Sequence, residues 1–338
     1  MIEKPEPLKG IGVVSGGLDS YLAVKLLCDL GVEVYLYHLL TGFSGKKDLP
    51  NPVYKMAEHL DLPLETEEDY TAFLEMLKYP QFGRGTAINP CIDCHIFMFK
   101  KAKEYMDKIK GHFIFTGEVL GQRPMSQHRN ALNLIERETG LERILLRPLS
   151  AKHLAPTMME ENGWIERSKL LSLKGRSRKP QIQLAREWGI TEYPAPAGGC
   201  LLTDKEFGYR LKDLLDSGDE SKNSIELLKY GRHFRLSPTT KVIIGRNESE
   251  NNEIENLNQS GDLLLILADI PGPTGLLSGN TNINLITLAG RIIKRYSHAS
   301  ELPEATLIVK ASNGEEKQRI CIEGNIQEKE LDNFRIKK

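Results

Sequence analysis

The sequence predicts an α/β protein in which an open parallel sheet is followed by a smaller α+β domain. In the first part of the chain, apolar runs typical of buried parallel strands alternate with segments of helical periodicity. The expected strands are 12–14, 32–40, 113–117 and 144–149, and the expected helices are 19–30, 52–60, 70–77 and 91–109. A length of 338 residues suits two domains.

The Pro- and Gly-rich stretch 193–199 marks the edge of the first domain, so we expect domains 1–203 and 204–338. The second domain carries few chemistry-bearing motifs and shows no internal repeat. We expect helices at 207–215, 224–228 and 282–296, and strands at 241–245, 263–267, 305–309 and 319–322, the last two as a hairpin.

Composition gives the broad class of the protein. Charged residues make up 27% and apolar residues 40% of the chain, and the net charge is −1. Such a balance is ordinary for a globular protein, so nucleic-acid binding must come from a local patch. The first seven residues lack the apolar core of a signal peptide, and no apolar run reaches membrane-spanning length. We therefore expect a cytoplasmic protein without a membrane partner.

The first expected strand runs into Ser15-Gly16-Gly17-Leu18-Asp19-Ser20, and a helix is expected to begin at about Asp19. The glycines expose backbone N–H groups, the serines add hydroxyl donors, and the positive helix end points into the same loop. These features suit an anion such as pyrophosphate. The loop is neither a Walker A motif nor a dinucleotide fingerprint. The alternative interpretation is a strand-to-helix turn that merely needs glycine.

Ser-Gly-Gly-Leu-Asp-Ser resembles the PP-loop of ATP pyrophosphatases, which cleave ATP between the α and β phosphates. The resemblance implies an adenine nucleotide α hydrolase-like, Rossmann-like domain that binds ATP with Mg²⁺. Loops that follow strands line the ligand crevice of such a sheet, and 41–45 is the expected adenosine contact. The polar stretch 121–127 is either part of the site or an ordinary loop. The residues assigned to the nucleotide are Ser15, Gly16, Gly17, Asp19, Ser20, His38, Thr116 and Gly117.

Cys91 and Cys94 stand three apart at an expected helix start, where the helix end should lower the pKa of their thiols. A c-type haem at Cys-x-x-Cys-His would require export, and a zinc site usually needs four ligands. A redox pair leaves the phosphate loop unexplained. With Cys200, which follows two glycines, three thiolates could hold three irons of a [4Fe-4S] cluster and leave one iron open. Burial in apolar elements is expected to explain Cys28 and Cys321.

The segment 167–186 contains seven Lys and Arg residues and no Asp or Glu. A run of charge is usually a solvated face. The absence of acidic residues favours contact with a phosphate backbone instead. The expected RNA-binding residues are Lys174, Arg176, Arg178 and Lys179.

Two resemblances complete the assignment. The first 200 residues resemble the PP-loop enzymes that thiolate tRNA, the 4-thiouridine synthetases and 2-thiouridylases. The residues that carry this resemblance are Ser15–Ser20, Asn89-Pro90-Cys91, Cys94, Phe115-Thr116-Gly117, Leu146-Arg147-Pro148-Leu149 and Gly199-Cys200. It implies that Cys91, Cys94 and Cys200 hold the cluster in the cluster-dependent branch. Residues 245–251 and 268–272 resemble the RNA-binding domain of fibronectin-binding-like ribosome quality-control proteins.

The expected function is ATP-dependent tRNA uridine thiolation, with Asp19, Cys91, Cys94 and Cys200 as catalytic residues. The uridine carbonyl would be adenylated and then attacked by sulfur. The expected partners are tRNA and a sulfur donor, either a cysteine desulfurase or inorganic sulfide, and a homodimer is compatible with the sequence. One alternative is a cluster-free enzyme that uses a persulfide. A second alternative is an RNA-binding protein whose cysteines bind structural zinc and whose PP-loop is a relic without ATP turnover. A third is an amide-forming PP-loop ligase that acts on a small molecule. The target uridine stays open.

Overall fold

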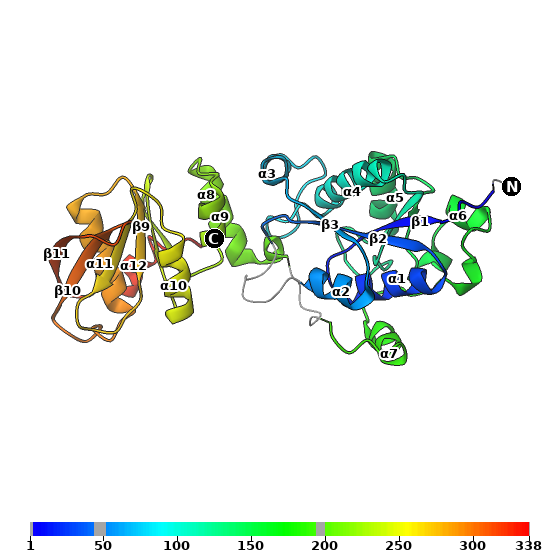
Figure 1. Cartoon of the computed structure of the whole chain (residues 1–338). Coiled ribbons are helices and arrows are strands. Elements are labelled where there is room, and N and C mark those ends of the chain that lie inside the picture. Colours follow the sequence, from blue (N-terminus) through cyan, green and yellow to red (C-terminus); the bar gives the residue numbers. More distant parts are fainter. Residues whose placement is uncertain (1–2, 44–51, 194–199, 338) are drawn as a thin grey trace. The chain divides into compact units, whose positions relative to one another are not determined.

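A computed structural model describes residues 3–43, 52–193 and 200–337 of the chain. The chain divides into two compact units, Met1–Thr203 and Asp204–Lys338, each described here by itself (Figure 1). The Pro- and Gly-rich residues 194–199 lie outside the described part. No helix among the described residues is long and apolar enough to cross a membrane.

The first unit is built on a five-stranded sheet in the order β3-β2-β1-β4-β5, and every pair in it is parallel. Its strands are β1 (Lys9–Val13), β2 (Glu33–Leu39), β3 (Leu64–Glu67), β4 (Phe113–Thr116) and β5 (Leu145–Leu146). In this order the chain reverses its direction of progress between β1 and β4. Ligands bind at the carboxyl ends of strands at such a switch point.

Helices cover both faces of this sheet, with α1, α2 and α7 on one side and α4 and α5 on the other (Figure 1). The helices are α1 (Leu18–Asp29), α2 (Pro52–Leu60), α3 (Tyr70–Lys78), α4 (Cys91–Lys108), α5 (Arg129–Thr139), α6 (Met158–Glu161) and α7 (Lys179–Glu187). Short 3-10 turns lie at Ala151–His153, Arg167–Lys169 and Leu201–Thr203. The expected open parallel-sheet α/β domain is confirmed.

The apolar face of α1 explains why its segment folds as a helix over the sheet. Leu22 and Leu27 are fully buried, and they pack in one core with Val34 and Leu36 of β2. Residue Ala185 of α7 joins the same core, so α7 is anchored beside α1. The start of α1 is therefore fixed after the carboxyl end of β1, and α7 packs beside α1.

The second unit contains a six-stranded antiparallel sheet in the order β11-β10-β8-β9-β7-β6. Its strands are β6 (Arg232–Ser237), β7 (Thr240–Ile244), β8 (Leu263–Leu267), β9 (Gly275–Gly279), β10 (Glu304–Ala311) and β11 (Glu316–Glu323). Its helices are α8 (Lys205–Asp216), α9 (Lys222–Leu227), α10 (Glu248–Asn256), α11 (Ile283–Arg295) and α12 (Glu328–Leu331). The expected smaller α+β domain is confirmed, including the β10–β11 hairpin.

Successive side chains along the strands of the second unit point to opposite faces of its sheet. This alternation gives the unit two apolar layers. Val242 and Ile244 of β7 point into the core that α11 covers, whereas Ile243 points to the opposite face. On that opposite face Ile243 packs with Ile254 of α10. Successive strand residues face opposite sides of a sheet, so one short strand serves both layers. The sheet therefore holds α10 and α11 on its two faces.

Candidate active site

The phosphate loop joins β1 to α1. Its helix begins at Leu18, one residue earlier than expected, with Gly17 as the N-cap. The hydroxyl of Ser20 accepts a hydrogen bond from the Ser15 N–H at 3.2 Å and lies 3.2 Å from the Ser15 hydroxyl, which closes the loop on itself. Gly16 adopts a φ of +73°, and a β-carbon there would lie 2.8 Å from Pro52. The loop thus needs glycine at position 16.

The end of β4 lies against this loop. Thr116 pairs with Val13 across the β1–β4 register, and its side chain is buried. A β-carbon at Gly117 would lie 2.4 Å from the carbonyl carbon of Asp19. No other residue than glycine fits there unless the backbone moves. The switch point therefore brings the expected residues Thr116 and Gly117 directly to the phosphate loop.

His38 lies near the end of β2, on the other side of β1. Its Nδ1–H donates to the carbonyl of Val14 at 2.8 Å. Burial lowers the pKa of His38 below its ordinary value, although the bond to Val14 opposes the shift. The imidazole is therefore neutral at physiological pH, and its Nε2 is the acceptor nitrogen.

A polar network surrounds the carboxylate of Asp19. Gln122 Nε2 donates to Asp19 Oδ2 at 2.6 Å, and Arg178 Nη2 lies 3.4 Å from the same oxygen. Gln181 Nε2 donates to Gln122 Oε1 at 2.9 Å. Asp19 Oδ1 is buried without a hydrogen-bond partner among the described residues. An unsatisfied buried carboxylate oxygen is a candidate ligand for a cation.

Sequence reasoning missed Gln122 and Gln181 as members of this site. Gln122 lies in the polar stretch 121–127, which the sequence left open between site and loop, and its bond to Asp19 places it in the site. Gln181 stands in a helix that carried no sequence signal of its own beyond the basic residues around it. Contacts across 103 and 59 positions of the chain join these glutamines to their partners.

Cys91 and Cys94 are half-buried in the first turn of α4. Asn89 Nδ2 donates to Cys91 Sγ at 3.1 Å. Burial raises the pKa of Cys94, and the nearby Cys200, Cys91 and Asp93 raise it further. The expectation that the helix start lowers the pKa of Cys94 is therefore wrong, because desolvation of the thiolate dominates. Without a bound cation, Cys94 is a neutral thiol.

Cys200 lies next to the loop that follows β2, because the Leu201 N–H donates to the carbonyl of Phe43 at 2.9 Å. Its side chain reaches the surface, yet burial on its inner side raises the pKa of its thiol. A negative charge at Cys91 would raise the pKa of Cys200, and one at Cys200 would raise the pKa of Cys94. The structure thus brings the three expected cysteines into one electrostatic neighbourhood.

The three cysteines fit an iron–sulfur cluster in the kind of donor they supply. Clusters are held by Cys thiolates and tuned by hydrogen bonds to sulfur, such as the one that Asn89 donates. Within the described ranges, no three His, Cys, Asp or Glu side chains are close enough to hold a single metal ion. A multi-iron cluster is wider than one ion, so its ligands stand further apart.

The two remaining cysteines differ from expectation in one respect. Cys28 is half-buried at the edge of the first core, as a small apolar side chain in α1. Cys321 is exposed on β11, where its Sγ lies 3.4 Å from Glu304 Oε2. Burial therefore does not explain Cys321, because β11 is the edge strand of its sheet.

A buried ionic network connects the cysteine helix to the phosphate loop. His95 Nδ1 lies 2.8 Å from Glu118 Oε1, and Arg147 Nε donates to Glu118 Oε2 at 2.8 Å. Arg147, only 2% exposed, also pairs with Glu136. Burial alone would raise the pKa of Glu118, but the charge of Arg147 and the contact with His95 lower it to about 2. Glu118 is therefore ionised, and it directly follows Gly117.

The basic segment is less free of acidic partners than its sequence suggests. Arg167 pairs with Glu160, Lys169 lies 2.9 Å from Glu166, and Arg178 turns inward to Asp19. The expectation that the whole segment lacks acidic neighbours is wrong, because flanking and distant residues supply them. Exposed members for which no ion pair is found in the described part of the chain are Lys174, Arg176, Lys179 and Arg186.

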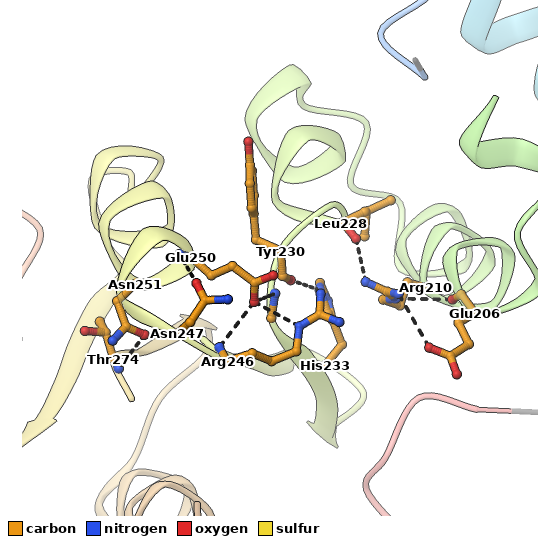
Figure 2. A network of polar contacts seen from close by, with 11 residues as sticks. Glu206, Arg210, Leu228, Tyr230, His233, Arg246, Asn247, Glu250, Asn251 and Thr274 are labelled. Atoms are coloured by element: carbon orange, nitrogen blue, oxygen red, sulfur yellow. Dashed lines mark hydrogen bonds and ion pairs between the residues drawn. The ribbon is translucent and has the colours of Figure 1, made fainter. Parts of the chain in front are cut away.

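In the second unit, the residues 245–251 make contacts with their own domain (Figure 2). Arg246 Nε and the Gly231 N–H both donate to Glu250 Oε2, at 2.9 and 3.1 Å. Asn247 caps α10 by accepting from the Glu250 N–H. Asn251 Oδ1 accepts from the N–H of Thr274, which ties α10 to the loop before β9. The side chains of this motif therefore mainly stabilise the fold of the second unit. Arg246 is its exposed cation, with 38% of the side chain accessible.

Two family models match the chain. Residues 8–153 match the model described as thiamine biosynthesis protein (ThiI), and residues 231–335 match the NFACT protein RNA binding domain. A stretch of 120 residues is 29% identical to the tRNA-specific 2-thiouridylase MnmA of Desulfosudis oleivorans. That match covers 34% of this chain and 33% of the relative, so the chain spans about a third of the length of the curated relative it matches.

Solved structures give distant similarities. A 4-thiouridine synthetase in complex with RNA and ATP is 19% identical, with 54% of this chain and 50% of that chain covered and a TM-score of 0.34. The U34-tRNA thiolase NcsA of Methanococcus maripaludis, with its [4Fe-4S] cluster, is 17% identical, with 65% and 70% covered and a TM-score of 0.33. The predicted resemblances are confirmed by the family models, because the first unit matches the ThiI model and the second unit matches the model of the NFACT protein RNA binding domain.

Proposed function

We propose that the chain is an ATP-dependent tRNA thiolation enzyme, which adenylates a uridine carbonyl and then transfers sulfur through Cys91, Cys94 and Cys200. One observation carries the proposal. His95, next to Cys94, contacts Glu118, and Glu118 follows Gly117, whose backbone lies against Asp19. These contacts link the start of the cysteine helix to the residues that border the phosphate loop, and this supports a reaction that uses both sulfur and ATP.

The phosphate loop supplies the groups for adenylation. The uridine carbonyl oxygen attacks the α-phosphate, pyrophosphate leaves, and the oxygen is now part of a good leaving group. N–H groups at Gly17 and the start of α1 hold the phosphates, since a helix N-terminus favours anions. Asp19 Oδ1, buried without a partner among the described residues, would hold Mg²⁺. Sulfur then attacks the activated carbon, and AMP departs with the former carbonyl oxygen.

The three cysteines would deliver the sulfur. Cys91, Cys94 and Cys200 would hold a [4Fe-4S] cluster, which when bound supplies a Lewis-acidic iron that keeps sulfur nucleophilic. Metal coordination would also overcome the raised pKa of Cys94, since a coordinating thiol is deprotonated outright. The second candidate keeps the enzyme without the cluster, with a persulfide on Cys91 or Cys94 and Cys200 as the resolving thiol. The half-buried position of Cys91 and the exposed position of Cys200 also allow this route.

RNA would contact the exposed cations of the basic segment and the second unit. Lys174, Arg176 and Lys179 project from a single short stretch beside the phosphate loop. The match of the second unit to an RNA-binding domain supports a second contact, with Arg246 as an outward cation. Phosphate contacts of this kind position RNA without reading its sequence. They leave the choice of uridine to other groups.

Mass spectrometry of tRNA nucleosides from a deletion strain tests the proposal. We expect one thiolated uridine to disappear, to return with the wild-type gene, and to stay absent with Asp19→Ala or Cys94→Ala. Cys28→Ala is the matched control and should restore it. An unchanged nucleoside profile in the deletion strain would contradict the proposed activity. Iron content and brown colour after anaerobic purification separate the cluster from the persulfide.

A further inference from the structure

The start of α7 lies beside the phosphate loop and is held there by backbone bonds. The Gly175 N–H donates to the carbonyl of Leu120 at 2.7 Å, in the loop that follows β4. Leu120 also forms a parallel bridge with Lys174, and α7 packs on α1, the helix of the phosphate loop. Residues 174–181 are therefore held beside the helix of the phosphate loop and the loop that follows β4.

Three buried polar atoms in this region have unmet hydrogen-bonding capacity. They are Asp19 Oδ1, Arg178 Nε and Gln181 Oε1, none of which has a partner in the described ranges. Gln181 is only 1% exposed. Leaving such atoms unsatisfied costs free energy, so a cluster of them calls for an explanation. All three atoms belong to side chains of one connected network, in which Asp19 contacts Gln122 and Arg178, and Gln122 contacts Gln181, so a ligand bound at this network could satisfy them.

The contact between Arg178 and Asp19 is loose. Nη2 lies 3.4 Å from Oδ2, whereas a charge-assisted N–H to carboxylate bond is usually about 2.7 to 2.9 Å long. The same Oδ2 already accepts a 2.6 Å bond from Gln122. The guanidinium therefore shares this oxygen with Gln122, while its own Nε has no partner in the described ranges. Arg178 is therefore held near Asp19 by one long contact, without a short charge-assisted hydrogen bond.

We propose that Arg178 is a phosphate-binding residue of the ATP site, and that α7 links this contact to RNA bound on its outer side. The inference rests on the proposed function and deepens it. A guanidinium suits phosphate because its planar fork can donate two bonds at once. ATP offers more negative charge than one shared carboxylate oxygen, so Arg178 turns from Asp19 to the phosphates when ATP binds.

The exposed side of residues 174–181 offers the contacts to RNA. Lys174, Arg176 and Lys179 are exposed, and Arg178 among them is mostly buried. RNA phosphates on these cations would order the start of α7, and with it Arg178. Binding of RNA should therefore strengthen binding of ATP, and by linkage ATP should strengthen binding of RNA by the same factor.

Equilibrium binding of α,β-methylene-ATP to the full chain tests the inference, with and without tRNA. Arg178→Gln should weaken nucleotide binding at least about tenfold and abolish the effect of tRNA on it. Arg178→Lys should recover part of both, because it keeps the charge but not the fork. The matched control Arg176→Gln, two residues away and exposed, should bind nucleotide normally without tRNA and bind tRNA more weakly.

Each outcome separates the inference from the proposed function. If wild-type protein binds the nucleotide and Arg178→Gln binds it equally well, the role of Arg178 is refuted while the enzyme assignment stands. If Arg178→Gln weakens nucleotide binding but tRNA still strengthens it by the wild-type factor, the link through α7 is refuted. If wild-type protein binds no nucleotide, the proposed function itself fails. Matching unfolding midpoints for the Gln and Lys variants exclude loss of the fold as the cause.

Discussion

The backbone of Gly117 lies against that of Asp19 so closely that a β-carbon at Gly117 would come within 2.4 Å of the Asp19 carbonyl carbon and oxygen. Gly117 follows β4, and Asp19 lies in the first turn of α1. This contact fixes the phosphate loop to the strand across the switch point. It also makes Gly117 a structural glycine, in contrast to Gly17.

Gly117→Ala should therefore destabilise the chain by about 1 to 3 kcal/mol, the usual cost of overpacking, and weaken ATP binding together with it. Gly17→Ala should fold almost normally, because the new β-carbon would meet only the Ser15 hydroxyl at 3.5 Å, and Gly17 has an ordinary φ of −76°. It should nevertheless weaken ATP binding, since the added methyl group would stand in the loop to which we assign the phosphates. Urea unfolding and ATP titration of both variants check this. Equal loss of stability in the two would contradict the distinction.

The buried Glu118–Arg147 pair predicts a dependence of stability on acid pH. The pKa of Glu118 falls from 4.5 to about 2 in the folded chain. A carboxyl with a depressed folded pKa stabilises the fold above its unfolded pKa, and this stability is lost as the pH falls from about 4.5 to about 2. Glu118→Gln should lower the free energy of unfolding at pH 7 by about 3 to 5 kcal/mol and flatten its acid dependence.

Glu161→Gln is the control for this prediction. Glu161 pairs with Arg143, but both side chains are exposed, at 42% and 65%. An exposed pair contributes about 0 to 1 kcal/mol, so this variant should keep nearly the full stability at pH 7. Denaturant midpoints measured from pH 2 to 7 compare the two variants. A loss as large in Glu161→Gln as in Glu118→Gln would show that burial of the pair is not the cause.

The exposed cations of the basic segment predict a salt-dependent contact with tRNA. Arg176→Glu combined with Lys179→Glu should weaken tRNA binding and reduce the slope of log K against log salt by about one unit for each lost phosphate contact. Lys108→Glu combined with Lys110→Glu changes the net charge equally at the far end of α4, where both lysines are exposed. That control should keep the slope. An identical change in both double variants would mean that only net charge matters.

The cysteines predict a division into two groups. Cys91→Ala, Cys94→Ala and Cys200→Ala should each lose thiolation, and each should lose the iron of the anaerobically reconstituted protein, expected at about four atoms per chain. Cys28→Ala and Cys321→Ala should keep both, because Cys28 packs at the edge of the first core in α1 and Cys321 lies on β11 beside Glu304. Stoichiometric zinc without iron, or full thiolation by Cys200→Ala, would refute the cluster assignment and leave the persulfide or structural alternatives.

The sequence predicts local features of this fold well, because they depend on local physics. The helix that follows the loop is predicted to within one residue at each end, and the strand before it ends one residue earlier and begins three residues earlier than expected. Glycines and apolar periodicity act over a few positions, which is why the loop and helix could be predicted. The strand β3 has only half-buried residues and was not predicted, and neither was α10, whose polar sequence is stabilised by its cap and by Ile254. Short polar elements depend on tertiary contacts for their stability.

In the candidate site, too, the sequence predicts the residues of a local motif but not those that depend on distant contacts. Ser15, Gly16, Gly17 and Asp19 carry a local motif, and the sequence assigns them a role. The inward turn of Arg178 depends on a contact with Asp19 across 159 positions of the chain, which no local pattern contains. The raised pKa of Cys94 likewise results from burial by distant segments, whereas the helix start that suggests a lowered pKa is local.

The fate of the uridine carbonyl oxygen tests the central claim of adenylation most directly. The measurement uses tRNA with ¹⁸O at the uridine carbonyls, ATP, Mg²⁺ and sulfide, and follows AMP and thiouridine by mass spectrometry. Because the carbonyl oxygen attacks the α-phosphate and departs with it, we predict one ¹⁸O atom in AMP for each thiouridine formed. Thiouridine that forms with unlabelled AMP, or with ADP as the product, would contradict the account.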